Sequence, residues 1–544
     1  MKTNKQLLIL VLITFIAFLV RFIYSSTYPP LLWDEAALGY NAFSILKTGR
    51  DEYGSFLPLI FKSFGDYKPG LYVYLSIPFI AIFGLNQLAV RLPSILLGSL
   101  TPLLLYKLII AINPKKKKLA IISAFLLAIT PFHIHFSRGA WETNIFTFQL
   151  VLASFTFIKY FNTKKVKYLL ISSLIFGLSL YTYQSAKMMS LLIIVLLSAQ
   201  NLKTIVKNPK KLVTLFILPL AVFTIPIAAR LVTATDSNRL QVLSIFSYPR
   251  SDIEKQQLIS YSSPLKYQLY NGNTVFFIRS TLSRYLNHLS PNFLFFKGDW
   301  QNPRHSAIYT GVLLLASIIF LPLGLLSCRP VSKLDMFFLT WLLIAPIPSA
   351  LTRDSLSAVR SACLVIPLTY FTVKGIIYLS KIFKKHLLSF NLSLLTAYLL
   401  TFIYYGDLYL NHTVKTNPSD YLYGYKHAVE YINQNKPKYD QVYLTDFYGQ
   451  PYIYYLFFSQ YPPGKFQQQA NLETDSTDVG KINNIDNIYF HSIPYNQNQT
   501  QDLIIYSKDE VWRQQLDKLP NFNVLFDPIG VINNQAQFYA YPKN

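Results

Sequence analysis

Residues 87–136 read QLAVRLPSILLGSLTPLLLYKLIIAINPKKKKLAIISAFLLAITPFHIHF, and this stretch decides the fold class. It holds two apolar runs, 87–112 and 119–136, separated by the consecutive lysines Lys115–Lys118. A helix of about 20 apolar residues matches the thickness of the bilayer core. Lysines between two such runs indicate a short cytoplasmic loop, because cytoplasmic loops carry an excess of Lys and Arg. The stretch therefore predicts two consecutive membrane-spanning helices.

Similar apolar runs continue in both directions, from the N-terminus to about residue 410. Of the 544 residues, 52% are hydrophobic and only 14% are charged, which excludes a soluble enzyme, a disordered protein and a coiled coil. The two cysteines, Cys328 and Cys363, exclude a disulfide scaffold and a cysteine-built metal site. We predict eleven membrane spans, near residues 6–24, 87–112, 119–136, 141–161, 167–184, 188–200, 211–229, 306–327, 334–351, 358–380 and 387–409.

The distribution of charge sets the orientation of these spans. The net charge is +24, but residues 1–411 hold 40 Lys and Arg against 13 Asp and Glu, whereas residues 412–544 hold 10 against 13. The basic excess therefore lies in the hydrophobic part and indicates membrane topology rather than nucleic-acid binding. Segment 71–84 is short and contains Pro78, so we predict an interfacial helix there. Eighteen Lys and Arg then fall in short cytoplasmic loops, which predicts a multi-pass protein of the cell membrane with a cytoplasmic N-terminus.

The same topology predicts two domains. Residues 1–411 form a membrane domain with two large outer loops, 25–86 and 230–305. Residues 412–544 form a polar tail on the extracytoplasmic side. Helix-like and strand-like patterns alternate in this tail, which predicts a small α/β domain, with a helix at 423–434 and strands at 441–445, 487–491 and 503–506.

The first outer loop carries the acids that are most suggestive of chemistry. Trp33-Asp34-Glu35 directly follows the first span, and Asp66-Tyr67-Lys68-Pro69 follows about thirty residues later. Carboxylates at a span boundary cost desolvation energy unless they are paired or used. Adjacent acids point to different sides of a helix, so one can face a reacting hydroxyl while the scaffold holds the other. The Lys68 ammonium is suited to meet a lipid phosphate. The alternative is that these are ordinary solvated loop residues.

Further cations recur on the outer side of the membrane. Arg138 either pairs with Glu142 four residues later or binds an anion. Arg304-His305, Arg353 and Arg360 lie at headgroup depth, where either an anionic ligand or interface anchoring accounts for them. The His133 and His135 spacing suits a strand, and a third metal ligand is missing from the motif. The sequence has no phosphate-binding glycine loop, so a sugar donor must arrive within the membrane.

These motifs resemble those of a known enzyme family. Trp33-Asp34-Glu35 resembles the Asp-Glu motif of the protein O-mannosyltransferases and the bacterial aminoarabinose transferases. Asp66-Tyr67-Lys68-Pro69 is similar to the acid-Lys-Pro motif of their first loop, although aminoarabinose transferases tend to have Glu at the position of Asp66. Phe83-Gly84 with the VRLPS stretch 90–94 is typical of their next helix, and Ser137-Arg138 and Arg304-His305 fit bacterial members. The resemblance covers roughly residues 1–410 and is strongest at 30–100.

The resemblance implies a GT-C fold of the glycosyltransferase family 39 type. Such enzymes transfer a sugar from a polyprenyl-phosphate carrier on the outer face, with inversion. A phosphate leaves readily, so one carboxylate base suffices, and we predict Asp34 in that role. Glu35 then positions Asp34 or holds the acceptor, and Asp66 orients Lys68 or contacts the sugar. Fixed cations stabilise the departing phosphate. The predicted substrate-binding residues are Trp33, Tyr67, Lys68, Arg91, Arg138, Glu142, Arg304, His305, Arg353 and Arg360.

The predicted partners are a polyprenyl-phosphate-linked sugar, the lipid bilayer, and an acceptor that is a glycan, a lipid or a protein. We expect no cofactor and do not favour a divalent metal. Two alternatives stay open: a flippase or transporter of lipid-linked sugars, and a ligase that uses a diphosphate-linked glycan. The spans are nearly free of charge and the charges gather at one boundary, which favours interfacial chemistry over transport.

Overall fold

The computed structural model describes residues 2–64, 66–232, 244–261, 263–473, 480–496 and 501–542. The chain folds as two compact units: unit 1 contains Met1–Phe22 and Ser94–Leu408, and unit 2 contains Ile23–Pro93 and Tyr409–Asn544. This division differs from the predicted boundary between residues 411 and 412, because the first outer loop packs with the tail. The Tyr454 hydroxyl donates a hydrogen bond to the Leu31 carbonyl at 3.1 Å, and Gly39 lies against the Phe457 ring.

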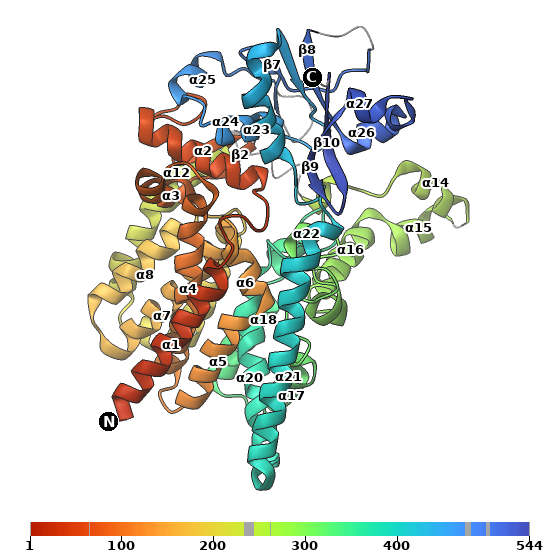
Figure 1. Ribbon diagram of the computed structural model, residues 1–544. Helices are drawn as coiled ribbons and strands as arrows, with labels where there is room; N and C mark the ends of the chain where they lie inside the picture. Colours follow the sequence, from red (N-terminus) through yellow and green to blue (C-terminus); the bar gives the residue numbers. More distant parts are fainter. Residues whose placement is uncertain are drawn as a thin grey trace. The chain divides into compact units, whose positions relative to one another are not determined.

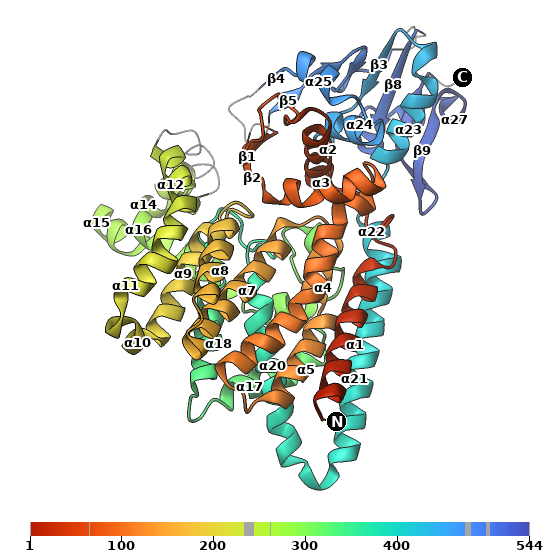
Figure 2. The ribbon, with the colours of Figure 1, turned by 90° about the vertical axis from the view of Figure 1, so that its left-hand side faces the viewer.

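In the part of unit 1 that the structure describes, the regular secondary structure is helical, apart from an isolated bridge between Ser244 and Thr352. Within unit 1, α7, α8 and α9 lie side by side (Figure 2). Helix α4 (Gln87–Ile112) begins in unit 2 and continues into unit 1. The other helices of unit 1 are α1 (Lys2–Phe22), α5 (Lys117–Ile129), α6 (Pro131–Arg138), α7 (Glu142–Thr163), α8 (Val166–Ser179), α9 (Ala186–Gln200), α10 (Leu202–Lys207), α11 (Pro209–Leu212), η1 (Val213–Ile217), α12 (Leu218–Val232), η2 (Ile245–Ser247), α14 (Asp252–Ser260), α15 (Pro264–Asn271), α16 (Asn273–Asn287), η3 (Asn292–Phe296), η4 (Pro303–His305), α17 (Ser317–Leu326), α18 (Lys333–Ile344), α19 (Ile347–Ala350), η5 (Ala362–Leu364), α20 (Val365–Ile382), η6 (Lys384–His386) and α21 (Leu387–Asp407).

The apolar helices correspond to the predicted spans. Among the described residues, seven helices are long and apolar enough to cross a membrane, or eight if the bent pair α5 and α6 forms one span. Three further predicted spans correspond to the shorter apolar helices α8, α9 and α17. A fourth short apolar helix, α3 (Leu71–Phe83), coincides with the segment predicted to be interfacial. Each predicted span therefore has its helix, while the number of crossings stays a prediction.

One predicted span is wrong over its first half. Residues 306–316 contain no α-helix, and α17 begins only at Ser317. Part of this segment runs alongside residues 293–294: the Val312 N–H donates to the Phe293 carbonyl at 3.1 Å, and the Leu313 N–H donates to the Leu294 carbonyl at 2.9 Å. A Cβ at Gly311 would overlap the backbone of Leu294, so the glycine permits this close approach. Backbone pairing replaces the helix that apolarity alone predicts.

Unit 2 is built around a mixed sheet, with strand order β6-β7-β3-β8-β10-β9 (blue, Figure 1). Strand β3 pairs in parallel with β7 and β8, and the other pairs are antiparallel. The predicted α/β tail is confirmed. Its elements are η7 (Leu408–His412), α22 (Thr413–Thr416), α23 (Tyr425–Asn435), η8 (Lys436–Lys438), β3 (Gln441–Leu444), α24 (Pro451–Phe458), α25 (Pro463–Gln469), β4 (Leu472–Glu473), β5 (Lys481–Ile482), β6 (Asn484–Ile485), β7 (Ile488–Tyr489), β8 (Asp502–Ser507), α26 (Lys508–Arg513), η9 (Leu516–Lys518), α27 (Phe522–Leu525), β9 (Asp527–Ile532) and β10 (Gln535–Tyr541).

The first outer loop adds helix α2 (Trp33–Thr48) and a short hairpin to unit 2. The hairpin pairs β1 (Ile60–Ser63) with β2 (Asp66–Pro69) in antiparallel register, and Phe61 lies opposite Lys68. Helix α3 follows β2 after Gly70 and packs against α2. A Cβ at Gly70 would overlap the Phe61 ring, so glycine permits the tight passage from strand to helix. This arrangement brings β2 to the start of α2, although the two are some thirty residues apart in sequence.

Candidate active site

Asp34 and Lys68 form an ion pair at the start of α2. The Lys68 ammonium contacts Asp34 Oδ1, and the Trp33 indole N–H donates to Asp34 Oδ2 at 3.2 Å. Lys68 also lies over the Phe64 ring, 5.1 Å from its centroid. The side chains of Asp34 and Lys68 stay 32% and 21% exposed, so a ligand can reach both. The structure thus joins three residues that sequence reasoning assigned to one site.

Glu35 has a different environment from its neighbour Asp34. Its carboxylate is buried and accepts two hydrogen bonds from Arg91, from Nε at 2.7 Å and from Nη2 at 2.6 Å. Glu35 also accepts the Leu32 backbone N–H at 3.1 Å, which closes the first turn of α2. Arg91 in turn donates to the carbonyls of Ser25 and Pro29 at 2.9 and 3.0 Å. This buried pair therefore fixes the chain that enters α2, and the predicted roles of Glu35 and Arg91 toward substrate stay predictions.

The other two residues of the first-loop motif lie on β2. Tyr67 is half-buried and pairs with Lys62 in the hairpin register. The backbone of Asp66 begins β2 opposite Ser63, but the side chain of Asp66 lies outside the described residues. The predicted catalytic role of Asp66 therefore stays a prediction.

Glu52 is a titratable residue of this unit that sequence reasoning missed. Its side chain is fully buried, its Oε1 accepts from the Asn41 amide at 3.0 Å, and its Oε2 has no hydrogen-bond partner. Burial raises the pKa of Glu52 to about 8, although the hydrogen bond from Asn41 and the charge of Lys68 lower it. Glu52 is therefore mostly protonated at neutral pH. The only sequence signal is the turn Asp51-Glu52-Tyr53-Gly54, which looks like a solvated loop.

Replacing Glu52 by Gln is expected to stabilise the protein at alkaline pH. The folded-state pKa of Glu52 is about 8 against an ordinary 4.5. The contribution of Glu52 to the free energy of unfolding is therefore fully present below pH 4.5 and is lost as pH rises through 8. At pH 9 the wild type must bury a carboxylate, whereas the amide of the variant carries no charge. Thermal unfolding should show a higher Tm for Glu52→Gln at pH 9 and an unchanged Tm at pH 5. The control is Glu430→Gln on the exposed face of α23, which should shift neither value; equal shifts at both pH values for Glu52→Gln would contradict the assignment.

In unit 1, Arg138 lies at the end of α6 and is directed to the backbone of α1. Its Nη1 donates to the Val20 carbonyl at 2.7 Å, and the side chain is buried.

The buried Arg21 donates to Ser137 Oγ and to His133 Nδ1, both at 2.7 Å. Arg21 is a second residue that sequence reasoning missed, although a lone cation within an apolar run was an available signal. The strand suggested by the spacing of His133 and His135 is wrong, because Pro131 starts a helix there.

His305 belongs to a buried network with Asp299. The His305 Nδ1–H donates to Asp299 Oδ2 at 3.0 Å, and the same oxygen accepts the Ala358 N–H at 2.8 Å. Burial acts to raise the pKa of Asp299, but the hydrogen bonds from His305 and from backbone N–H groups outweigh burial and hold that pKa below its ordinary value. The His305 ring packs edge-on against Trp141, with centroids 5.3 Å apart. Sequence reasoning selected His305 but gave Asp299 no role.

The remaining predicted residues of unit 1 lie in three places: Arg304 in η4, Glu142 in α7, and Arg353 and Arg360 in the loop before η5. His135 Nε2 donates to the backbone carbonyl of Arg304 at 2.9 Å, which ties α6 to η4. Glu142 is half-buried at the first turn of α7. The loop before η5 carries the other two: Arg360 forms an ion pair with Asp354, and Arg353 donates to the Tyr248 hydroxyl at 3.2 Å. Within the described residues, three or more His, Cys, Asp or Glu side chains do not gather as metal ligands would.

Comparisons with known proteins agree with this architecture. Residues 67–228, which include Lys68, Arg91 and Arg138, match the family described as dolichyl-phosphate-mannose-protein mannosyltransferase. ArnT from Cupriavidus metallidurans, solved with bound undecaprenyl phosphate, superposes with a TM-score of 0.51 at 12% identity, and the alignment covers 97% of both chains. The chain has the GT-C fold. The GT-C resemblance inferred from the first-loop motifs is thereby confirmed, and this protein is a multi-pass membrane protein.

Other comparisons show that the similarity of this GT-C protein to solved structures is low in sequence and, for one of them, partial in coverage. ArnT in the apo state gives the same TM-score of 0.51 at 10% identity, over 97% of both chains. The Archaeoglobus fulgidus oligosaccharyltransferase, solved with Zn and sulfate, matches at 15% identity with a TM-score of 0.48. That alignment covers 79% of this chain and 55% of the archaeal chain, so the present chain spans little more than half of that enzyme. No curated protein sequence matches the chain.

Proposed function

We propose that this GT-C protein transfers a sugar from a polyprenyl-phosphate carrier to an acceptor hydroxyl on the outer face of the membrane, with inversion. The contact between Asp34 and Lys68 is the observation that carries the proposal. It joins a carboxylate that can act as a base to a cation that can hold a phosphate, in a partly exposed place. The family match from residue 67 and the undecaprenyl phosphate bound by ArnT support the choice of carrier.

The proposed step needs only these two charged groups. The acceptor oxygen bonds to the anomeric carbon on the face opposite the phosphate, and the bond from that carbon to the phosphate oxygen breaks. Asp34 takes the hydroxyl proton. The phosphate leaves with the bonding electron pair, and Lys68 stabilises the charge that it gains. Because Lys68 contacts Asp34, an arriving donor phosphate competes for the ammonium and frees the Asp34 oxygen for the acceptor hydroxyl.

The experiment uses the purified protein in lipid nanodiscs with two donor classes. A monophosphate-linked sugar panel should release polyprenyl phosphate and transfer label to a cell-envelope acceptor extract. A matched diphosphate-linked panel should give no transfer. Transfer from the diphosphate donors alone would establish the ligase alternative, and movement of a labelled lipid across the bilayer without sugar transfer would establish the flippase alternative.

Lys68→Ala is expected to lower kcat/KM for the donor by about 10²–10³-fold, because it removes a fixed cation at the developing phosphate charge. The matched control is Lys62→Ala, which removes an ammonium from the other strand of the same hairpin, where Lys62 lies over the Tyr53 ring. Steady-state kinetics with varied donor measures both variants. Equal losses of kcat/KM in the two variants would show that the enzyme uses only the net positive charge of the hairpin. Lys68 would then have no specific contact with the donor phosphate.

A further inference from the structure

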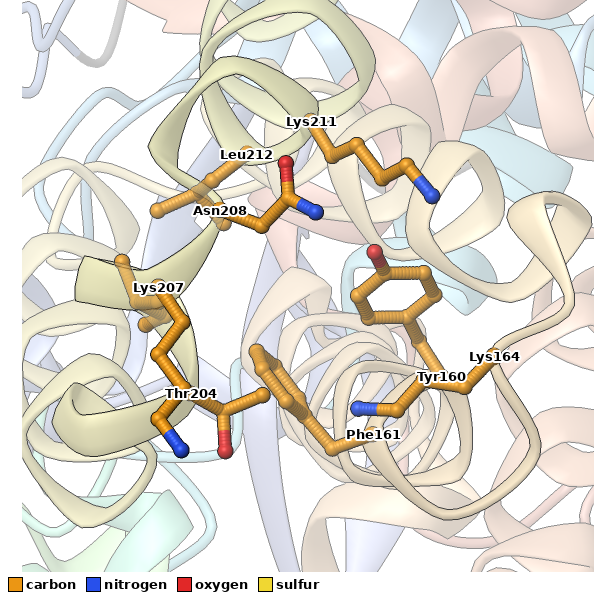
Figure 3. Close-up of a pocket in the computed structure, with 9 residues that line it drawn as sticks. Tyr160, Phe161, Lys164, Thr204, Lys207, Asn208, Lys211 and Leu212 are labelled. Atoms are coloured by element: carbon orange, nitrogen blue, oxygen red, sulfur yellow. The ribbon is translucent and has the colours of Figure 1, made fainter.

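A basic hollow lies in unit 1 on the side that topology predicts to be cytoplasmic. Three segments line it: the end of α7 with Lys164 after it, α10 with Asn208 after it, and the end of α11 (Figure 3). Its volume is about 200 Å³. The ammonium groups come from Lys164, Lys207 and Lys211, and Tyr160, Thr204 and Asn208 add polar groups. Figure 3 shows the three lysines at different edges of the hollow, and the Lys164 ammonium lies 5.4 Å from the centroid of the Phe161 ring.

The charge of this hollow is not balanced by the protein. None of the residues that line it is acidic, and among the described residues these three lysines form no ion pair within 4.0 Å. An excess of lysine in cytoplasmic loops accounts for their presence. It does not account for three lysines that line one hollow without an acid among the lining residues, where like charges repel one another unless an anion lies between them.

The surroundings of the hollow identify the class of anion. On α10, Leu202 and Val206 are four residues apart and 56% and 66% exposed, so one face of this helix is apolar. Val213 and Ile217, four residues apart on η1, are exposed as well. An apolar rim beside a basic site is the arrangement that binds a lipid headgroup together with its acyl chains. The volume lies below the range of about 300–1,000 Å³ that drug-sized ligands occupy, so the hollow is suited to a small group such as a phosphate.

We propose that Lys164, Lys207 and Lys211 form a binding site for the phosphate group of an anionic membrane lipid. The site is separate in its residues from the transfer chemistry of Asp34 and Lys68, so its test does not depend on the proposed function. It would anchor the α7–α8 and α10–α11 connections at the membrane surface. Arginine at these positions would retain the charge that the site uses.

The test compares two triple variants of the full chain in detergent. Lys164→Gln, Lys207→Gln and Lys211→Gln together remove the site, and Lys116→Gln, Lys117→Gln and Lys118→Gln remove the same charge from another exposed loop on the same predicted side. The probes are dioctanoyl phosphatidylglycerol and inorganic phosphate, with binding followed by native mass spectrometry and thermophoresis. We expect the first variant to bind the lipid about 10- to 100-fold more weakly and the second to change by less than about twofold.

Other outcomes would overturn the proposal. Equal weakening in the two triple variants would mean that only general loop charge attracts the lipid. Inorganic phosphate that binds as tightly as the lipid would show that the hollow takes a free anion. The triple arginine variant should keep wild-type lipid affinity, and its failure to do so would also contradict the site. An unchanged Tm in all three variants shows that each is folded, which is expected because the lysines are exposed.

Discussion

Asp34→Asn is expected to lower the rate of sugar transfer by about 10²–10⁴-fold, which is the usual loss when a single general base is removed. The amide keeps the shape of the carboxylate and can still accept from the Trp33 indole, but it cannot take the acceptor proton. The measurement is single-turnover release of polyprenyl phosphate at saturating donor. Donor affinity should not fall and is expected to rise, because the variant removes the carboxylate that competes with the donor phosphate for Lys68.

Stability separates this loss from a structural defect. The Asp34–Lys68 pair is partly exposed, so its removal should cost no more than about 1 kcal/mol of unfolding free energy. Asp34→Asn should therefore be as stable as the wild type while it is nearly inactive. Asp34→Glu keeps a base but displaces it by one methylene, so we expect intermediate activity. Near-normal transfer by Asp34→Asn would show that another group is the base.

The sequence predicts the membrane helices well because a bilayer imposes one simple requirement. The run at 87–112 coincides with α4, since a helix must satisfy its own backbone hydrogen bonds in lipid. Residues 306–316 depart from the same rule: they form turns, and the backbone of Val312 and Leu313 pairs with residues 293–294, which apolarity alone does not reveal. Contacts between distant segments are the information that composition lacks.

The candidate site also has features that the sequence predicts and features that only the structure shows. The sequence selects Asp34 and Lys68 by charge at a boundary, but their contact depends on a hairpin of two four-residue strands without the apolar alternation that predicts strands. The sequence predicts that one of the two adjacent acids faces a reacting hydroxyl while the scaffold holds the other. Only the structure shows that Glu35 is the one bound to Arg91. Glu52 could not be recognised, because its pKa is raised by burial against elements far away in sequence.

Breaking the Glu35–Arg91 pair is expected to cost about 3–5 kcal/mol of unfolding free energy, because the remaining partner is left buried without its counter-charge. Glu35→Gln should unfold at a markedly lower temperature than the wild type. Arg91→Gln should be worse, since it also removes the hydrogen bonds that Arg91 donates to the carbonyls of Ser25 and Pro29. Arg91→Lys should not restore stability, because an ammonium cannot form the two parallel hydrogen bonds.

An exposed pair in the same unit supplies the matched control. Lys426 and Glu430 on α23 are separated by 3.8 Å and are 56% and 49% exposed, so removing either should cost only about 0.3–0.5 kcal/mol. A double-mutant cycle with Glu35→Gln and Arg91→Gln should give a large coupling energy, whereas the cycle at Lys426 and Glu430 should give almost none.

The stability and activity of the single variant Glu35→Gln together decide the role of Glu35. If Glu35→Gln is as stable as Glu430→Gln yet inactive, Glu35 contacts the acceptor; if its activity falls only as its stability falls, Glu35 is a positioning residue that holds the start of α2 under Asp34.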